Sequence, residues 1–280
     1  MGRQRFCVSL VPNPTLRELP KETPMAFDNS PFRYGAQAPG YAGTQVEVDQ
    51  GLRAFMLGVY NNMVIGLGIS GLVALGLNMA ATAQTATGQL ALTPFGQMLY
   101  QSPLKWVLML APLAFIFIFS MRMDRMSAAS ARTTFFAFAA VMGASLSTLL
   151  IRYTGASVVQ VFFITAAAFG SLSLWGYTTN RSLSGMGSFL IMGLVGLILA
   201  SIVNIFVASS MLQFGISVIG VLIFAGLTAY DTQKLKEMYL YGNFDSETAA
   251  KASVFGALTL YLDFINMFQF LLALVGNRNQ

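Results

Sequence analysis

The chain has 280 residues, of which 55% are hydrophobic and only 10% are charged, and its net charge is +5. Soluble domains carry roughly a quarter of charged residues, so this composition excludes an ordinary water-soluble domain. The positive charge lies almost wholly in the connections between apolar segments, which excludes a basic nucleic-acid-binding face. Histidine is absent and Cys7 is the only cysteine, so an intrachain disulfide, a thiolate metal cluster and a histidine base are excluded as well.

The first 50 residues are polar and rich in proline and glycine, and they show no sustained hydrophobic period. This pattern predicts a disordered cytoplasmic tail over residues 1–50, with a short amphipathic helix near Val46–Phe55 as the alternative. No apolar segment follows the charges of the first seven residues, so we expect no signal peptide there.

Seven apolar segments follow, each close to the roughly 20 residues that cross the hydrocarbon core of a bilayer. We therefore predict an all-α integral membrane protein with a seven-helix transmembrane domain over residues 51–280. The fifth and sixth segments are almost continuous, and Ser209–Ser210 marks the predicted break between them. The predicted spans are Phe55–Ala80, Leu104–Met121, Thr133–Ile151, Val158–Tyr177, Phe189–Ala208, Met211–Tyr230 and Ser253–Val275.

Lysine and arginine residues are distributed unequally between the two sides of these spans. Thirteen of them precede the first span or lie in the connections after the second, fourth and sixth, whereas three lie on the other side. Because such residues accumulate on the cytoplasmic side of a membrane, we predict a cytoplasmic N-terminus and a C-terminus outside.

Asp263 lies in the seventh span, with about ten residues of mainly apolar sequence on either side. A carboxylate near the middle of a bilayer costs at least about 3 kcal/mol, so it should face the interior of the bundle and have a partner. Thr259 and Asn266, four residues before and three after, extend a polar stripe on the same helix face. The alternative is a protonated aspartate with a purely structural hydrogen bond inside the bundle.

Asp231 closes the sixth span, where an acidic residue at a cytoplasmic helix end needs no special explanation. Two features favour a functional role. The helix is expected to continue through Lys234–Tyr239, which buries Asp231 two or more turns deep. In addition, Ser217, Gly220 and Thr228 share its small or polar helix face.

The depths of the two aspartates predict that they meet. Asp231 lies eight residues before Tyr239 and Asp263 twelve after Lys251, which corresponds to about 12 and 18 Å at about 1.5 Å per residue. Two such carboxylates on antiparallel neighbours should share one proton. Arg122 closes the second span on the same side, and its guanidinium would hold the charged pair closed, whereas protonation would loosen it. A positive residue that merely reaches the lipid headgroups is the alternative for Arg122.

Two motifs resemble the transmembrane Bax inhibitor motif family, in its bacterial branch. They are Tyr230–Gln233 (YDTQ) and Leu260–Asn266 (LYLDFIN), supported by Val59–Asn61 (VYN) at the first span and Met121–Arg122 at the end of the second. The likeness covers about residues 50–275.

This resemblance implies a bundle in which six helices surround a central seventh. It also implies a calcium leak in the bacterial plasma (inner) membrane that opens with pH through the pair Asp231 and Asp263, with Arg122 as a latch and Arg125 as the fallback. Calcium would contact the two aspartates only in transit, and neither a resident cofactor nor nucleic acid is expected. The supporting residues are Tyr230, Tyr261, Asn266 and Thr259.

Two other functions stay open beside the leak. The family includes bacterial members that modulate a membrane-anchored quality-control protease, and the tail over residues 1–50 would be the partner-binding part. Paired aspartates on adjacent spans also resemble an intramembrane aspartyl protease. However, that type has Gly-x-Gly-Asp where this chain has Tyr261–Asp263, and a later Pro-Ala-Leu turn, whereas no proline follows Pro112. We therefore expect no enzymatic activity.

Overall fold

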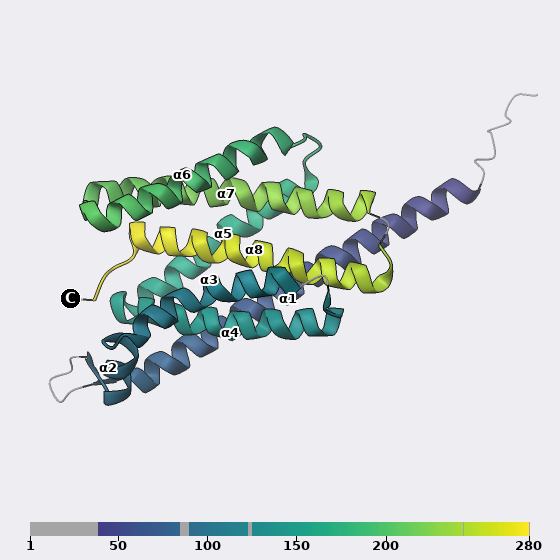
Figure 1. The fold of residues 1–280 in the computed structure, drawn as a ribbon. Coiled ribbons are helices and arrows are strands. Elements are labelled where there is room, and N and C mark those ends of the chain that lie inside the picture. Colours follow the sequence, from purple (N-terminus) through teal and green to yellow (C-terminus); the bar gives the residue numbers. More distant parts are fainter. Residues whose placement is uncertain (1–38, 85–89, 123–124, 243, 280) are drawn as a thin grey trace, which may run out of the picture. The chain divides into compact units, whose positions relative to one another are not determined.

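The computed structural model describes residues 39–84, 90–122, 125–242 and 244–279, so residues 1–38 of the predicted tail lie outside the described part. Eight helices and a small hairpin appear there (Figure 1). The elements are α1 (Pro39–Ala81), β1 (Thr82–Gln84), β2 (Leu90–Leu92), α2 (Pro94–Tyr100), α3 (Leu104–Arg122), α4 (Ala128–Arg152), α5 (Gly155–Thr178), α6 (Ser184–Val207), α7 (Ser210–Tyr241) and α8 (Ser246–Val275).

Six of these helices are long and apolar enough to cross a membrane. The number rises to seven if α2 and α3, which bend by 57° at their junction, count as one broken span. This arrangement confirms an all-α integral membrane bundle. The antiparallel hairpin of β1 and β2 and the short helix α2 were not predicted, because three-residue strands and a seven-residue helix lie below what hydrophobic periodicity resolves.

The prediction of a disordered tail over residues 1–50 is wrong for its last residues, because α1 already begins at Pro39. The alternative helix near Val46–Phe55 is instead one part of a continuous helix of 43 residues. Starting a helix is costly, but the membrane span is already helical. Each residue added before it therefore gains a backbone hydrogen bond without a new nucleation step. At about 1.5 Å per residue α1 is about 65 Å long, twice the roughly 30 Å of the hydrocarbon core.

The predicted break between the fifth and sixth spans is confirmed at Ala208 and Ser209, between α6 and α7. Ala208 adopts a left-handed backbone conformation with φ of 51°. The hydroxyl of Ser209 then caps α7 by accepting the backbone N–H of Leu212 at 3.3 Å. Helix α7 continues to Tyr241, as the sequence predicted for the segment after Tyr230.

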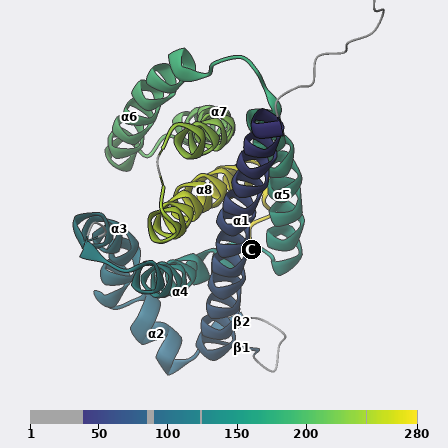
Figure 2. The same cartoon turned by 90° about the vertical axis from the view of Figure 1, so that its right-hand side faces the viewer.

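Within residues 42–280, α8 is the central helix, in agreement with the expected position of the seventh span. It packs against α4, α5 and α7, and Figure 2 shows it among the other helices. In the most apolar 18-residue stretch of α8, half of the residues are buried, compared with 11% in the corresponding stretch of α6. The surface of α6 is therefore left to face lipid. Any residue that α8 presents to α7 therefore lies in the interior of the bundle.

Candidate functional site

The packing of α7 against α8 determines which residues face each other. Gly256 of α8 lies against the side chain of Leu235, and Gly220 of α7 lies against the ring of Phe270. These two contacts fix an antiparallel register in which Asp231 lies opposite about residue 260. One further helical turn along α8 reaches Asp263.

The structure brings the carboxyl groups of Asp231 and Asp263 together at this interface. The charge of Asp231 acts on the carboxyl group of Asp263, and the two side chains interact directly. Asp263 is only 5% exposed, and its Oδ2 atom is fully buried without a hydrogen-bond partner among the described residues. Asp231 is partly buried. An unpartnered buried oxygen is costly, which marks this pair as a site with a special requirement.

Among the described residues, the charges that act on Asp231 and Asp263 do not include that of the predicted latch Arg122. It ends α3, and both Arg122 and the fallback Arg125 are exposed. The cation whose charge acts on Asp231 is Lys234, three residues later on α7. Its Nζ atom lies 5.9 Å from the centre of the Tyr230 ring. In the sequence, the i to i+3 spacing of Asp231 and Lys234 on a helix was the signal for this effect of charge.

Two of the supporting residues are packing groups next to the pair. Gly187 of α6 leaves the space that the ring of Tyr230 occupies. Tyr261 is completely buried, and its ring packs edge-to-face with the rings of Phe135 and Phe138. Its hydroxyl lies 2.6 Å from the Oγ atom of Ser70 on α1.

The other two supporting residues turn back onto their own helix. The hydroxyl of Thr259 donates to the carbonyl of Phe255 at 3.2 Å, and the amide of Asn266 donates to the carbonyl of Leu262 at 2.8 Å. The structure therefore gives neither side chain a hydrogen bond to Asp263, although all three lie on α8.

A chain of hydrogen-bonded hydroxyl groups links α1, α5 and α7, and the sequence analysis did not predict it. The hydroxyl of Tyr60 lies 2.6 Å from that of Ser173, which lies 2.8 Å from that of Thr232. Thr232 donates to the carbonyl of Thr228 at 2.7 Å, one turn back along α7. These groups connect α1 and α5 to the turn of α7 that carries Asp231.

Comparison with known proteins decides the family. A family model described as "Inhibitor of apoptosis-promoting Bax1" matches residues 52–280. The chain belongs to this Bax inhibitor family. Three bacterial relatives are similar over nearly their whole length. An uncharacterized protein of Caulobacter vibrioides is 46% identical over 235 residues, which cover 84% of this chain and 93% of the relative.

The second relative, an uncharacterized protein of Rickettsia prowazekii, is 43% identical over 230 residues, which are 82% of this chain and 92% of the relative. The inner membrane protein YbhL of Escherichia coli is 40% identical over 236 residues, which are 83% of this chain and 95% of the relative. The Bax inhibitor family match and the apolar helices agree on a multi-pass membrane protein, and the name of YbhL places that relative in a bacterial inner membrane.

The site of this Bax inhibitor family member offers few ligands to a metal ion. The described part of the chain holds no cluster of three or more acidic, cysteine or histidine side chains. Calcium takes six to eight oxygen ligands, of which Asp231 and Asp263 supply at most four.

Proposed function

We propose that this protein is a pH-sensitive calcium leak channel of the bacterial plasma membrane, gated by Asp231 and Asp263. One observation carries the proposal: the two carboxyl groups interact across the α7–α8 interface, while an oxygen of Asp263 is buried without a hydrogen-bond partner in the described part of the chain. Ionisable groups inside a membrane protein are expensive and mark ion or proton pathways. No catalytic role is proposed for either aspartate.

The chemistry of the pair supplies the gate. In a site of low dielectric constant the two carboxyl groups hold one proton between them near neutral pH, because two adjacent negative charges repel each other. The shared proton makes a charge-assisted hydrogen bond that ties α7 to α8. Acidification adds the second proton and removes the charged acceptor. The tie then weakens and the helices separate, which opens the path for calcium.

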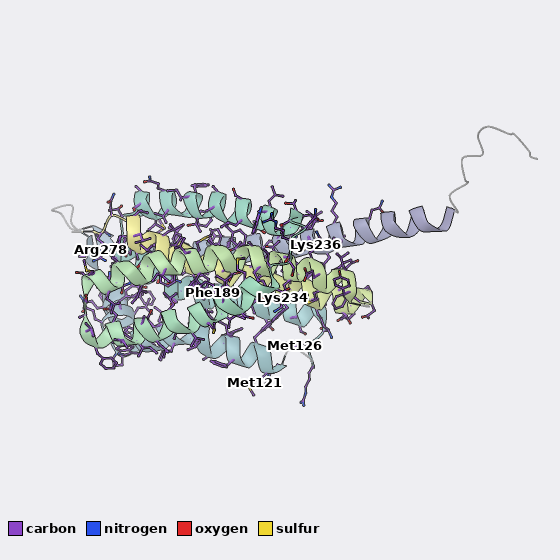
Figure 3. The ribbon with its side chains drawn as sticks, turned by 90° about the horizontal axis from the view of Figure 1, so that it is seen from above. Met121, Met126, Phe189, Lys234, Lys236 and Arg278 are labelled. Carbon is purple, nitrogen blue, oxygen red and sulfur yellow. The ribbon has the colours of Figure 1, made fainter. Side chains whose placement is uncertain are left out.

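The positions of the lysine residues bear on which side of the membrane the pair senses. Lys234 lies on the side of the bundle away from Arg278, together with Lys236 (Figure 3). If this lysine-bearing end is cytoplasmic, as the distribution of charge predicts, the pair senses cytoplasmic pH. Arg122 is exposed in this state, so its proposed latch on the pair requires α3 to move towards α7 and α8.

Calcium flux into proteoliposomes tests this function. Purified protein in vesicles with a calcium-sensitive dye inside should admit calcium faster as the pH is lowered from about 8 to about 6. The range spans two pH units, or a hundredfold in proton activity, and a one-proton gate with its midpoint near the centre of the range should raise the initial rate by about tenfold. Protein-free vesicles give the background, and a rate equal to that background at every pH would refute the channel.

A second candidate is a regulator of a membrane-anchored protease. The length of α1 favours it, since a helix of about 65 Å extends well beyond the membrane and offers a surface to a partner. Removal of residues 1–50 separates the two functions. Loss of protease regulation with unchanged calcium flux would identify the N-terminal segment as the regulatory part.

A further inference from the structure

Each aspartate of the pair is close in sequence to a residue whose hydroxyl group is bonded to another helix. Thr232 follows Asp231 directly, and Tyr261 precedes Asp263 by two residues. Two residues on an α-helix differ by about 200°, so a bond that holds Tyr261 towards α1 leaves Asp263 facing the opposite side. That side is α7, where Asp231 lies.

The direction of the first hydroxyl chain follows from counting protons. A hydroxyl group has one proton to donate. Thr232 donates its proton to the carbonyl of Thr228, so Ser173 must donate to Thr232. Tyr60 must then donate to Ser173. Thr232 and Ser173 are 0% and 2% exposed, so water does not replace these bonds.

The second hydroxyl chain runs in the same way. Ser70 donates to the carbonyls of Ala139 at 2.7 Å and Gly66 at 3.0 Å, which uses its only proton. Tyr261 must therefore donate to Ser70. Through this bond the turn of α8 that carries Asp263 is tied to α1 and α4. Both chains pass through α1, at Tyr60 and at Ser70, about 15 Å apart along the helix.

We infer that these two hydroxyl chains position the carboxyl pair, with Tyr60, Ser173 and Thr232 holding Asp231, and Ser70 and Tyr261 holding Asp263. The inference rests on the proposed function only where the pair is called a gate. Helix α1 sets the separation of the carboxyl groups, because it anchors both chains. Besides the two aspartates, the charge that acts on Asp231 is that of Lys234 on α7, and Tyr60 and Tyr261 are the titratable members of the two hydroxyl chains. The variable that the hydroxyl groups control is the separation of the carboxyl groups.

Infrared spectroscopy of the protein in lipid nanodiscs tests this positioning without any flux. The infrared band to follow is the carbonyl stretch of a protonated carboxyl group that is present in the wild type and absent in Asp263→Asn. The pH at which this band has lost half of its intensity is the midpoint of the pair. Thr232→Val removes the interhelical hydroxyl at constant shape. The carboxyl groups then move apart, and their mutual repulsion no longer holds the shared proton so strongly. The midpoint for loss of this shared proton therefore shifts to lower pH by about 0.5 unit, or about threefold in proton concentration. Thr232→Ser keeps the hydroxyl and the wild-type midpoint.

The control is Thr165→Val in α5, since Thr165 is also 0% exposed but donates to the carbonyl of Val161 in its own helix. Its midpoint should equal that of the wild type. Tyr60→Phe removes the hydroxyl group at the other end of the same hydroxyl chain and should shift the midpoint in the same direction as Thr232→Val. It replaces Thr232→Val in the test if Thr232→Val does not fold. Equal midpoints for Thr232→Val, Tyr60→Phe and the wild type would overturn the inference. A shifted midpoint together with pH-independent wild-type flux would leave it standing and refute the channel.

Discussion

Replacement of Asp263 by asparagine should abolish the pH response of calcium flux while the protein still folds. Asparagine has the shape of a protonated aspartic acid and carries no charge, so it leaves the pair in a state that acid no longer changes. The buried, unpartnered Oδ2 atom becomes a neutral amide group, which lowers its desolvation cost. The amide group still donates to the charged Asp231, as the shared proton does in the closed pair. We therefore expect the about tenfold acceleration between pH 8 and pH 6 to fall below about twofold, with a low rate at both values.

Asp245→Asn is the matched control for this substitution. Asp245 is an exposed aspartate that caps the N-terminus of α8, and its hydrogen bonds with Thr248 hold its pKa below the usual value. It therefore stays ionised over the whole pH range of the flux measurement. Asparagine is an equally good helix cap, so this variant keeps the fold and should keep the pH response. An unchanged response in Asp263→Asn would show that the gate lies elsewhere.

Gly176→Val should destabilise the bundle by about 3 kcal/mol or prevent its assembly, because it forces two helix backbones apart. Gly176 on α5 is buried, and a Cβ atom there would run into the backbone of Ala229 on α7. Backbone atoms cannot rotate away as a flexible side chain can. The displaced part of α7 is the turn before Asp231, so the pair would be disturbed as well.

Gly170→Val supplies the control for this second substitution, since it lies in the same helix and a Cβ atom there meets nothing within 4 Å. The two variants share the helix propensity cost of valine, so their difference isolates the α5–α7 contact. Thermal unfolding in detergent should give a markedly lower midpoint for Gly176→Val alone. Similar midpoints would mean that the two helices are not closely packed at this position.

Much of the fold could be predicted because lipid imposes strong constraints on sequence. Runs of about 20 apolar residues predicted the spans, and the polar pair Ser209–Ser210 predicted the break between α6 and α7. The extension of α7 past Tyr230 followed from continued helix-forming residues. The start of α1 at Pro39 was missed, because a polar helix outside the membrane has no hydrophobic period.

The carboxyl pair could be located from depth along two adjacent helices, but its surroundings could not. Tyr60 and Ser173 are 113 residues apart and Ser173 and Thr232 are 59 apart, so no local spacing connects them. The charge of Lys234 on Asp231 is a second example, since the sequence analysis considered only Arg122 and Arg125 as cations for the pair. Helix ends show which residues share a side of the membrane, whereas the rotation of each helix determines which of them face the pair.

The central claim is that Asp231 and Asp263 act as one titrating unit. The most direct measurement is the pH dependence of calcium flux for the wild type, Asp231→Asn, Asp263→Asn and the double variant in the same proteoliposomes. Groups that act as a unit give strongly non-additive effects, so we predict that each single variant loses the response and that the double variant matches them. Two independent partial losses that add up in the double variant would contradict a shared proton and the gate built on it.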